Sequence, residues 1–223
     1  MIVAGGMGTR LGHPQPKALV TIAGDVMLRR TFARFHDAGL TERALVTLPA
    51  GFEHAFREAL APYESCAIQL VPGGKERQNS VANGLSKLDP DTDIVVIHDA
   101  ARPFVAVESI QASVDAAAEF GAATVAIPSI DTILVSDSNT FLVDTPDRAT
   151  LWACQTPQTF RLNVIREAHE AARRDGFLGT DDGSLVRRNG GRVKLVMGSP
   201  LNFKITTPAD LALAEAVVER GLA

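Results

Sequence analysis

The stretch "DIVVIHDAARPFVAVESIQASVDAAAEFGAATVAIP", residues 93–128, decides the fold. Its first segment (93–99) and its last segment (123–128) are short and rich in β-branched residues, as is typical of buried strands. The segment between them (107–120) has apolar residues at the spacing of one helical face: Val107, Ile110, Val114 and Ala118. A strand, a helix and a second strand in this order predict parallel strands joined by a right-handed crossover.

The same alternation precedes this unit. Further strands are expected at 43–48 and 67–71, and helical stretches lie near 26–38, 52–61 and 76–88. Repeated strand–helix–strand units predict a doubly wound α/β fold, with a mostly parallel, Rossmann-like sheet and helices on both faces. Ligands of such sheets bind beyond the carboxyl ends of the strands.

The alternation ends at residues 129–150. Two short β-like runs flank the turn-rich segment "SDSN" (136–139), which predicts a β-hairpin rather than another crossover. Because an isolated hairpin is only marginally stable in water, we expect it to be an arm that packs against a second subunit. After the arm we expect a helix at 162–175, a strand at 193–198 and a last helix with Thr207 as its N-cap.

Length and composition limit the class of protein. The whole chain, 1–223, fits a single domain. Its 26 acidic and 22 basic residues give a formal charge of −4, which argues against a nucleic-acid-binding protein. No apolar run approaches the roughly 18 residues of a membrane span, and no cleavable leader is visible, so we expect no membrane contact and a cytoplasmic protein. Cys66 and Cys154 stand in apolar surroundings and are expected to be buried free thiols.

A glycine-rich loop, "AGGMGTRLGHPQPKAL" (4–19), follows the first apolar residues. It is not a dinucleotide fingerprint, because Leu11 stands in place of the third glycine, and it lacks the spacing of a P-loop. The loop still offers free backbone N–H groups together with two cations, Arg10 and Lys17. These groups indicate an anionic ligand such as a phosphate, although a tight turn with solvated cations would also explain them.

Two further polar segments follow predicted strands. In "HDAARPF" (98–104), Asp99 is well placed to bind Mg²⁺ and Arg102 to bind a phosphate, whereas His98 is expected to be a buried core group. In "GGKERQNSVANG" (73–84), backbone amides and the Ser80 hydroxyl could bind the edge of a base. A turn followed by the first turn of a helix is the simpler interpretation of that segment.

The sequence contains no recognisable pair of nucleophile and general base. It has neither a Gly-x-Ser-x-Gly elbow nor a helix with paired histidine ligands. Its polar segments supply arginine, lysine, aspartate and small backbone loops. Such a set suits a reaction whose nucleophile needs no activation.

Taken together and in order, these motifs resemble the 2-C-methyl-D-erythritol 4-phosphate cytidylyltransferase family of the non-mevalonate isoprenoid pathway. The resemblance covers nearly the whole chain. It is carried by the following segments: "AGGMGTRLG" (4–12), "PK" (16–17), "GGKERQNSV" (73–81), "HDAARPF" (98–104), "LWACQTPQTF" (151–160), "TDDGSLV" (180–186) and "NFKITTPADL" (202–211). Each segment alone is a weak signal, and the collinear set is a strong one.

The resemblance implies a role for each matching position. Three cations would contact the nucleotide phosphates and stabilise the transition state: Arg10, Lys17 and Lys204. The nucleotide site would consist of Ala4, Gly5, Gly6, Gly74, Ser80 and Asp99. Asp99 would also hold Mg²⁺ or another divalent cation. The acceptor phosphate would be bound by Arg102, Thr132, Arg148 and Thr180. In this family two arms embrace in a homodimer, and residues 129–150 stand where that arm is expected.

Some positions depart from the family pattern. Ala18 and Leu19 follow Pro-Lys where the family usually has glutamine and an aromatic residue. Leu201 stands where an acidic residue often precedes the asparagine, which leaves Asp99 as the one carboxylate expected at the metal. The related ribitol-5-phosphate cytidylyltransferases share most of the pattern. The surroundings of Ala101 and Trp152 favour the methylerythritol enzyme without deciding the matter.

The resemblance implies a direct reaction between CTP and a phosphate monoester. The acceptor phosphate would attack the α-phosphorus of CTP in line and release pyrophosphate. Two other classes stay open from the residues alone. One is a nucleotidyltransferase for a different sugar phosphate or for a pterin cofactor. The other is a nucleotide-sensing domain that keeps the cleft without catalysis, which the intact arginine, lysine and aspartate set argues against.

Overall fold

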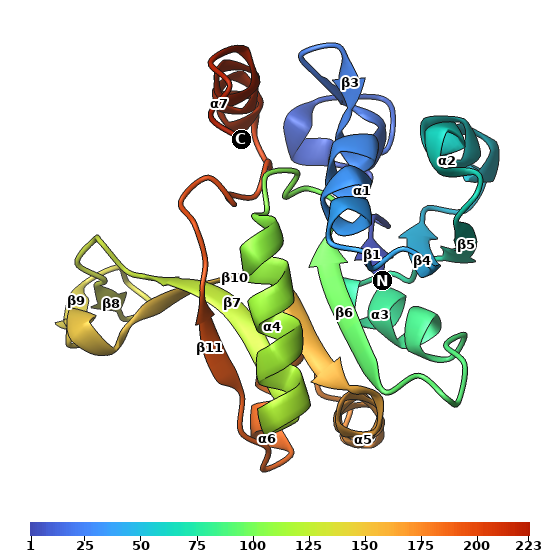
Figure 1. The fold of residues 1–223 in the computed structure, drawn as a ribbon. Coiled ribbons are helices and arrows are strands. Elements are labelled where there is room, and N and C mark those ends of the chain that lie inside the picture. Colours follow the sequence, from blue (N-terminus) through green and yellow to red (C-terminus); the bar gives the residue numbers. More distant parts are fainter.

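The computed structural model describes residues 1–223. At its centre is a seven-stranded sheet in the order β11-β7-β10-β6-β1-β4-β5 (Figure 1). Its strands are β1 (Ile2–Val3), β4 (Arg43–Leu48), β5 (Ala67–Pro72), β6 (Ile94–Asp99), β7 (Ala122–Pro128), β10 (Trp152–Arg161) and β11 (Lys194–Met197). Neighbouring strands run parallel except β10, which pairs antiparallel with both β6 and β7. The predicted doubly wound, mostly parallel fold is therefore confirmed.

Helices cover both faces of this sheet (Figure 1). One face carries α1 (Met27–Asp37), α2 (Glu53–Ala59) and α4 (Val107–Phe120), with Phe32 and Ile110 in its core. The other carries α3 (Arg77–Leu85), α5 (Leu162–Arg174) and α6 (Asp182–Arg188), with Phe160 and Ile165 in its core. The predicted helices near 26–38, 52–61, 76–88 and 107–120 correspond to α1, α2, α3 and α4. The short helix α6 is not among the predicted elements.

A smaller core joins the two ends of the chain. It contains Ile22 of β2 (Thr21–Ile22), which pairs with β3 (Asp25–Val26), and Val217 of α7 (Pro208–Glu219). Ile205, which is fully buried, belongs to the same core and immediately follows Lys204. Helix α7 begins, as predicted, with Thr207 as N-cap. This packing brings the segment around Lys204 beside the first glycine-rich loop.

Strand β10 is absent from the predicted strands. It contains a proline, and a register shift separates Cys154 from Gln158 where it pairs with β7. It also buries polar side chains, among them Gln158 and Thr159, each with no exposed surface. A proline and polar residues both count against a strand in a sequence-based reading. Burial of these side chains is possible because they hydrogen-bond side chains of neighbouring elements: Thr159 bonds Ser113, and Gln158 bonds Thr124 and Asp181.

The predicted apolar face of α4 is partly wrong. The fully buried positions are Ile110, Ser113 and Ala117, whereas Ala118 is exposed. Ser113 is buried because its hydroxyl lies 2.8 Å from that of Thr159 on β10. A hydrogen-bonded serine thus occupies a core position that lies outside the predicted apolar face.

The prediction for the cysteines is correct in one respect and wrong in another. Both thiols are free, as expected. However, Cys66 is only half-buried and Cys154 is exposed. Cys154 lies where β10 leaves the core for the arm, so its apolar neighbours in sequence do not enclose it. No helix has the length and apolar character required to cross a bilayer.

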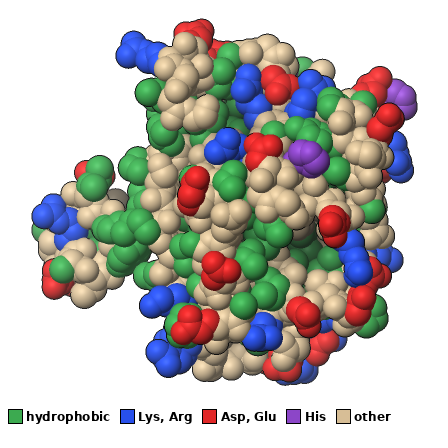
Figure 2. Space-filling view, in the orientation of Figure 1, with side chains coloured by type: hydrophobic (Ala, Val, Ile, Leu, Met, Phe, Trp, Pro, Cys, Tyr) green, Lys and Arg blue, Asp and Glu red, His purple; other side chains and the backbone are tan.

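The segment 129–150 projects from the sheet as an arm (Figure 1). It contains an antiparallel pair, β8 (Val135–Ser136) and β9 (Leu142–Asp144), as the predicted hairpin requires. Its apolar side chains are exposed: Ile130 keeps 85% of its surface and Phe141 keeps 71%. Figure 2 shows hydrophobic side chains gathered where the arm joins the body. None of the three hydrophobic core clusters contains a residue of the arm.

Candidate active site

A cavity of about 510 Å³ lies at the carboxyl ends of β1 and β6. It is formed by four segments that are distant in sequence: the first glycine-rich loop, the 74–80 segment, the end of β6 and the segment before α7. All nine residues predicted for the nucleotide site and its phosphates line it: Ala4, Gly5, Gly6, Arg10, Lys17, Gly74, Ser80, Asp99 and Lys204. The parallel sheet explains this meeting, because the carboxyl ends of its strands share one edge.

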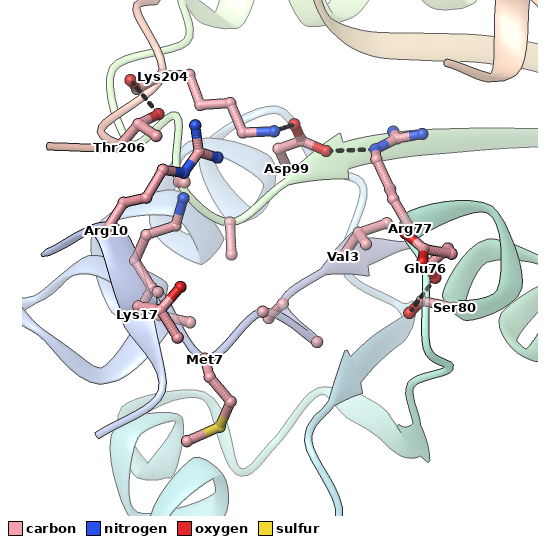
Figure 3. A pocket seen from close by; sticks show the side chains of 18 of the residues that line it. Val3, Met7, Arg10, Lys17, Glu76, Arg77, Ser80, Asp99, Lys204 and Thr206 are labelled. Carbon is pink, nitrogen blue, oxygen red and sulfur yellow. Dashed lines mark hydrogen bonds and ion pairs between the residues drawn. The ribbon is translucent and has the colours of Figure 1, made fainter. Parts of the chain in front are cut away.

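The first loop folds back so that Lys17 faces the cavity (Figure 3). Gly8 has φ +70, a left-handed backbone conformation, and the backbone N–H of Lys17 donates to the carbonyl of Gly6 at 3.3 Å. The Lys17 ammonium donates to the carbonyl of Ile205 at 3.0 Å. Burial, reinforced by the nearby charge of Lys204, lowers the pKa of Lys17 to about 8. Lys17 therefore lacks an anionic partner of its own.

Asp99 is buried at the end of β6 between two cations (Figure 3). Its Oδ1 accepts from Nε of Arg77 at 2.9 Å, and its Oδ2 accepts from Nζ of Lys204 at 2.7 Å. Its backbone N–H donates to the hydroxyl of Thr156 at 3.1 Å. Burial alone would raise the pKa of this carboxyl, but Arg77 and Lys204 outweigh burial and hold the pKa well below its usual range. Asp99 is therefore an anion at all physiological pH values.

Ser80 joins the two glycine-containing loops. Its hydroxyl accepts from the backbone N–H of Gly74 at 3.0 Å and donates to the carbonyl of Glu76 at 3.2 Å. A β-carbon at Gly5 would lie only 3.1 Å from the same hydroxyl oxygen. The serine thus fixes the spacing between the loops and leaves the bare backbone of Gly5 and Gly74 along the cavity wall.

His98 has the buried core position that the sequence predicted. It has no exposed surface, and burial lowers its pKa to about 4, so the ring is neutral at pH 7. Nδ1 lies 3.0 Å from the hydroxyl of Thr156, and Nε2 lies 3.0 Å from the carbonyl of Arg102. The ring therefore supports the backbone around Asp99 without facing the cavity.

The sequence analysis assigned no role to five polar residues of the lining: Thr9, Lys75, Glu76, Arg77 and Thr206. Arg77 is the most consequential, since its guanidinium also donates to Oδ2 of Asp182 at 2.6 Å. Its partners Asp99 and Asp182 lie 22 and 105 positions further along the chain. The spacing of residues near Arg77 in the sequence therefore could not predict either contact. The only available signal was its place inside the quoted segment "GGKERQNSV".

The chain matches the family model of 2-C-methyl-D-erythritol 4-phosphate cytidylyltransferase over residues 1–220. It belongs to that family. Among curated relatives, the cytidylyltransferase of Caldanaerobacter subterraneus is 44% identical over 222 residues, covering 99% of this chain and 98% of the relative. The same enzyme of Geobacillus kaustophilus is 43% identical over 225 residues, covering 100% and 97%.

Solved structures agree with this assignment. The 4-diphosphocytidyl-2C-methyl-D-erythritol synthase of Anaerococcus prevotii superposes with a TM-score of 0.88 at 28% identity, covering 98% of this chain and 96% of that one. The 2-C-methyl-D-erythritol 4-phosphate cytidylyltransferase of Thermus thermophilus gives a TM-score of 0.80 at 34% identity, covering 98% and 97%. Fold and sequence therefore lead to the same family.

The four residues expected at the acceptor do not line the cavity of a single chain. Thr132 and Arg148 lie exposed on the arm, where the Arg148 guanidinium donates to the carbonyl of Ile130 at 3.1 Å. Thr180 is exposed, two residues before α6. The guanidinium of Arg102 donates to the backbone carbonyls of Asn202 and Cys154 at 2.7 and 3.3 Å. In a single chain, the residues expected at the acceptor therefore lie outside the cavity that is lined by those expected at the nucleotide.

The carboxylates of the cavity can hold a divalent cation only with help from a ligand. No three histidine, cysteine or acidic side chains cluster at a possible metal site. Besides Asp99, Glu76 is the only acid on the lining, and its side chain caps the start of α3. Mg²⁺ is usually bound by one or two carboxylates together with substrate phosphates. A single ionised Asp99 on the wall of a cavity lined by several cations fits that pattern.

Proposed function

We propose that this chain transfers a cytidylyl group from CTP to 2-C-methyl-D-erythritol 4-phosphate and releases pyrophosphate. Family membership over residues 1–220 and whole-length relatives that bear this name support the assignment. The observation that carries it is the meeting of Arg10, Lys17, Lys204 and Asp99 in one cavity at the carboxyl edge of the sheet. We treat residues 1–223 as a single catalytic domain with 129–150 as its arm.

The chemistry needs charge compensation more than acid–base catalysis. A phosphate monoester carries about −1.5 to −2 charges at neutral pH and is already nucleophilic. One of its oxygens forms a bond to the α-phosphorus of CTP while the bond from that phosphorus to the bridging oxygen breaks. The electron pair leaves with pyrophosphate. The barrier arises from repulsion between two polyanions and from charge on the five-coordinate phosphorus, which preorganised cations offset.

The proposed roles follow the positions of the residues in the cavity. Lys17, Lys204 and the exposed Arg10 at the rim bind the phosphates and stabilise the transition state. Burial and the neighbouring charge of Lys204 lower the pKa of Lys17, and a phosphate bound between the two ammonium groups would favour their charged forms. We assign the cytidine to the backbone and hydroxyl groups of the two loops: Ala4, Gly5, Gly6, Gly74 and Ser80.

Asp99 is the proposed ligand for Mg²⁺ or another divalent cation. The cation would supply further neutralisation of the triphosphate when bound. In the structure Arg77 and Lys204 each donate to one oxygen of this carboxylate, so the two side chains orient it and keep it ionised.

The proposed acceptor site needs a second chain. Arg148 and Thr132 lie on an arm whose apolar side chains are exposed in one chain. We infer that two arms pack together in a homodimer and that each carries these residues to the partner's cavity. Thr180 and Arg102 would complete the acceptor site from the body. Cytoplasmic localisation stays a prediction from the sequence.

Release of pyrophosphate tests the function. The protein is mixed with CTP, Mg²⁺ and one acceptor from a panel: methylerythritol phosphate, ribitol 5-phosphate, a sugar 1-phosphate or no acceptor. We expect rapid release with the first acceptor and with CTP rather than UTP, GTP or dTTP. A clear preference for ribitol 5-phosphate would move the assignment to the related enzyme. CTP binding without release from any acceptor would favour a nucleotide-sensing domain.

A further inference from the structure

A chain of ion pairs extends from the cavity into the core behind it. Arg77 forms two of these pairs, with Nε 2.9 Å from Oδ1 of Asp99 and one terminal nitrogen 2.6 Å from Oδ2 of Asp182. Asp99 belongs to the cavity lining, whereas Asp182 does not. Only 1% of the Asp182 side chain is exposed. The buried carboxylate therefore reaches the cavity only through Arg77.

Asp182 is itself held from three sides. Its Oδ1 lies 3.1 Å from Nε2 of His169 on α5, a residue that is also buried. Its backbone N–H donates to Oε1 of Gln158 on β10 at 2.9 Å. It lies in the first turn of α6, where the helix dipole favours a negative charge. The carboxylate is therefore a fixed point against which Arg77 can be oriented.

Two carboxylates, Asp99 and Asp182, together keep the Arg77 guanidinium charged and balance the positive charge beside the cavity. Burial alone would lower the pKa of Arg77, but Asp182 and Asp99 outweigh burial and raise it above its usual range, so the guanidinium stays charged. With Lys204 included, two cations face two carboxylates, and the cluster is close to neutral. Without Asp182 an excess positive charge would stand beside Asp99.

We propose that Asp182 is a positioning residue for the divalent cation site. It anchors Arg77, which aims the Asp99 carboxylate into the cavity and, once neutralised by Asp182, does not repel a cation bound there. His169 and Gln158 keep Asp182 in place. This inference rests on the proposed function, because it concerns the cation that accompanies CTP.

The charge argument predicts opposite effects on two ligands. In Asp182→Asn the hydrogen-bonding shape is retained and one negative charge is lost. The uncompensated guanidinium then repels a divalent cation and attracts the triphosphate. Divalent binding weakens by about tenfold or more, the scale expected for a unit charge a few ångströms away in a shielded site. Binding of CTP in the absence of a divalent cation is unchanged or tighter. General damage to the site would weaken both.

Calorimetric titration measures both affinities without any acceptor. CTP is titrated into the full-length protein in EDTA, and Mn²⁺, as a probe for the cation site, is titrated into the protein saturated with CTP. Asp175→Asn is the matched control, because Asp175 pairs with Arg188 of α6 at the same 2.6 Å distance but at the surface. We expect the control to leave both affinities unchanged.

Two further variants distinguish an effect of the lost charge from a general loss of folding. Asp182→Glu keeps the charge and is expected to bind Mn²⁺ within a few-fold of the parent protein. Arg77→Lys keeps one charge but cannot bridge two carboxylates, so Mn²⁺ binding should weaken about tenfold. The proposal is overturned if Asp182→Asn and Arg77→Lys bind Mn²⁺ as the parent does, if Asp182→Glu is as weak as Asp182→Asn, or if the parent itself shows no Mn²⁺ binding. A parent that binds both ligands but releases no pyrophosphate contradicts the proposed function alone.

Discussion

Gly8 and Lys17 lie so close together that a β-carbon at Gly8 would stand 2.6 Å from the β-carbon of Lys17. Gly8 also has φ +70, which costs any other L-residue free energy. The glycine therefore sets the position of the lysine that we assign to the CTP phosphates. The opening loop is constrained at this point by its contact with Lys17 as well as by its turn.

Gly8→Ala tests this contact. We expect the free energy of unfolding to fall by about 1–2 kcal/mol from the backbone penalty, and kcat/KM to fall by about tenfold or more because Lys17 is displaced. Gly12→Ala is the control, since Gly12 has φ +69 but nothing lies within 4 Å of its β-carbon. It should lose similar stability in urea unfolding and keep its activity. Equal losses of activity in both variants would contradict the role of the contact.

The pKa of Lys17 predicts a pH dependence. Burial lowers this pKa to about 8, so the ammonium is present below pH 8 and is lost as the pH rises further. We expect kcat/KM for CTP, which reports the free enzyme, to fall above about pH 8. Arginine stays charged across this range. In Lys17→Arg the alkaline fall should therefore disappear, whatever the absolute rate. A profile that does not change would show that another group controls it.

Removal of the Lys204 ammonium should slow the chemical step. We expect kcat of Lys204→Ala to fall by roughly 10²–10³, the scale for loss of one preorganised charge-stabilising group. Single-turnover measurement of pyrophosphate release would separate this effect from product release. Lys87→Ala serves as the control, because Lys87 is exposed and lies away from the cavity lining. A Lys204→Ala enzyme with unchanged kcat would remove this residue from the proposed machinery.

Arg148 should act on the acceptor and not on the nucleotide. In Arg148→Ala we expect the KM for methylerythritol phosphate to rise about tenfold or more, as expected for loss of a bidentate contact to a phosphate. The KM for CTP should stay within about two-fold. The exposed Arg192 supplies the control substitution, Arg192→Ala. An effect confined to CTP would be incompatible with the assignment.

The arm predicts the assembly state. Phe141 is 71% exposed in a single chain, so Phe141→Asp costs the folded protomer little. If two arms pack together, a buried charge at this position should raise the dimer dissociation constant strongly. Sedimentation velocity over a dilution series measures that constant, and the KM for the acceptor should rise with it. A parent protein that sediments as a monomer at all concentrations would refute the shared acceptor site.

The sequence predicted those parts of the molecule whose signals are local. The parallel strands β6 and β7 and the crossover helix α4 follow from hydrophobic period, and the N-cap at Thr207 follows from residue type. Strand β10 was missed because Gln158 and Thr159 are buried through hydrogen bonds rather than through apolar character. A polar side chain of this kind is buried only because a hydrogen-bonding partner lies beside it in the fold, and the sequence does not show which residue that partner is.

The candidate site also contains residues that could be predicted from the sequence and residues that could not. Arg10, Lys17, Asp99 and Lys204 could be expected together because each follows a strand end or matches a family motif, and the structure gathers them around one cavity. Arg77 and its partner Asp182 could not be linked, because their contact depends on how α3 and α6 pack on one face of the sheet. Ion pairs between elements distant in sequence follow from packing alone.

Strand β10 begins at the end of the arm with Trp152, which pairs with Pro128 of β7. Four residues further along β10, the hydroxyl of Thr156 accepts a hydrogen bond from the backbone N–H of Asp99. Insertions and deletions therefore have opposite consequences on the two sides of the Trp152–Pro128 pair. Residues gained or lost near the hairpin tip, around 137–140, change only the reach of the arm. A single residue gained or lost between 153 and 156 would shift the Thr156 hydroxyl that supports Asp99. We expect length variation among homologous chains to be confined to the tip.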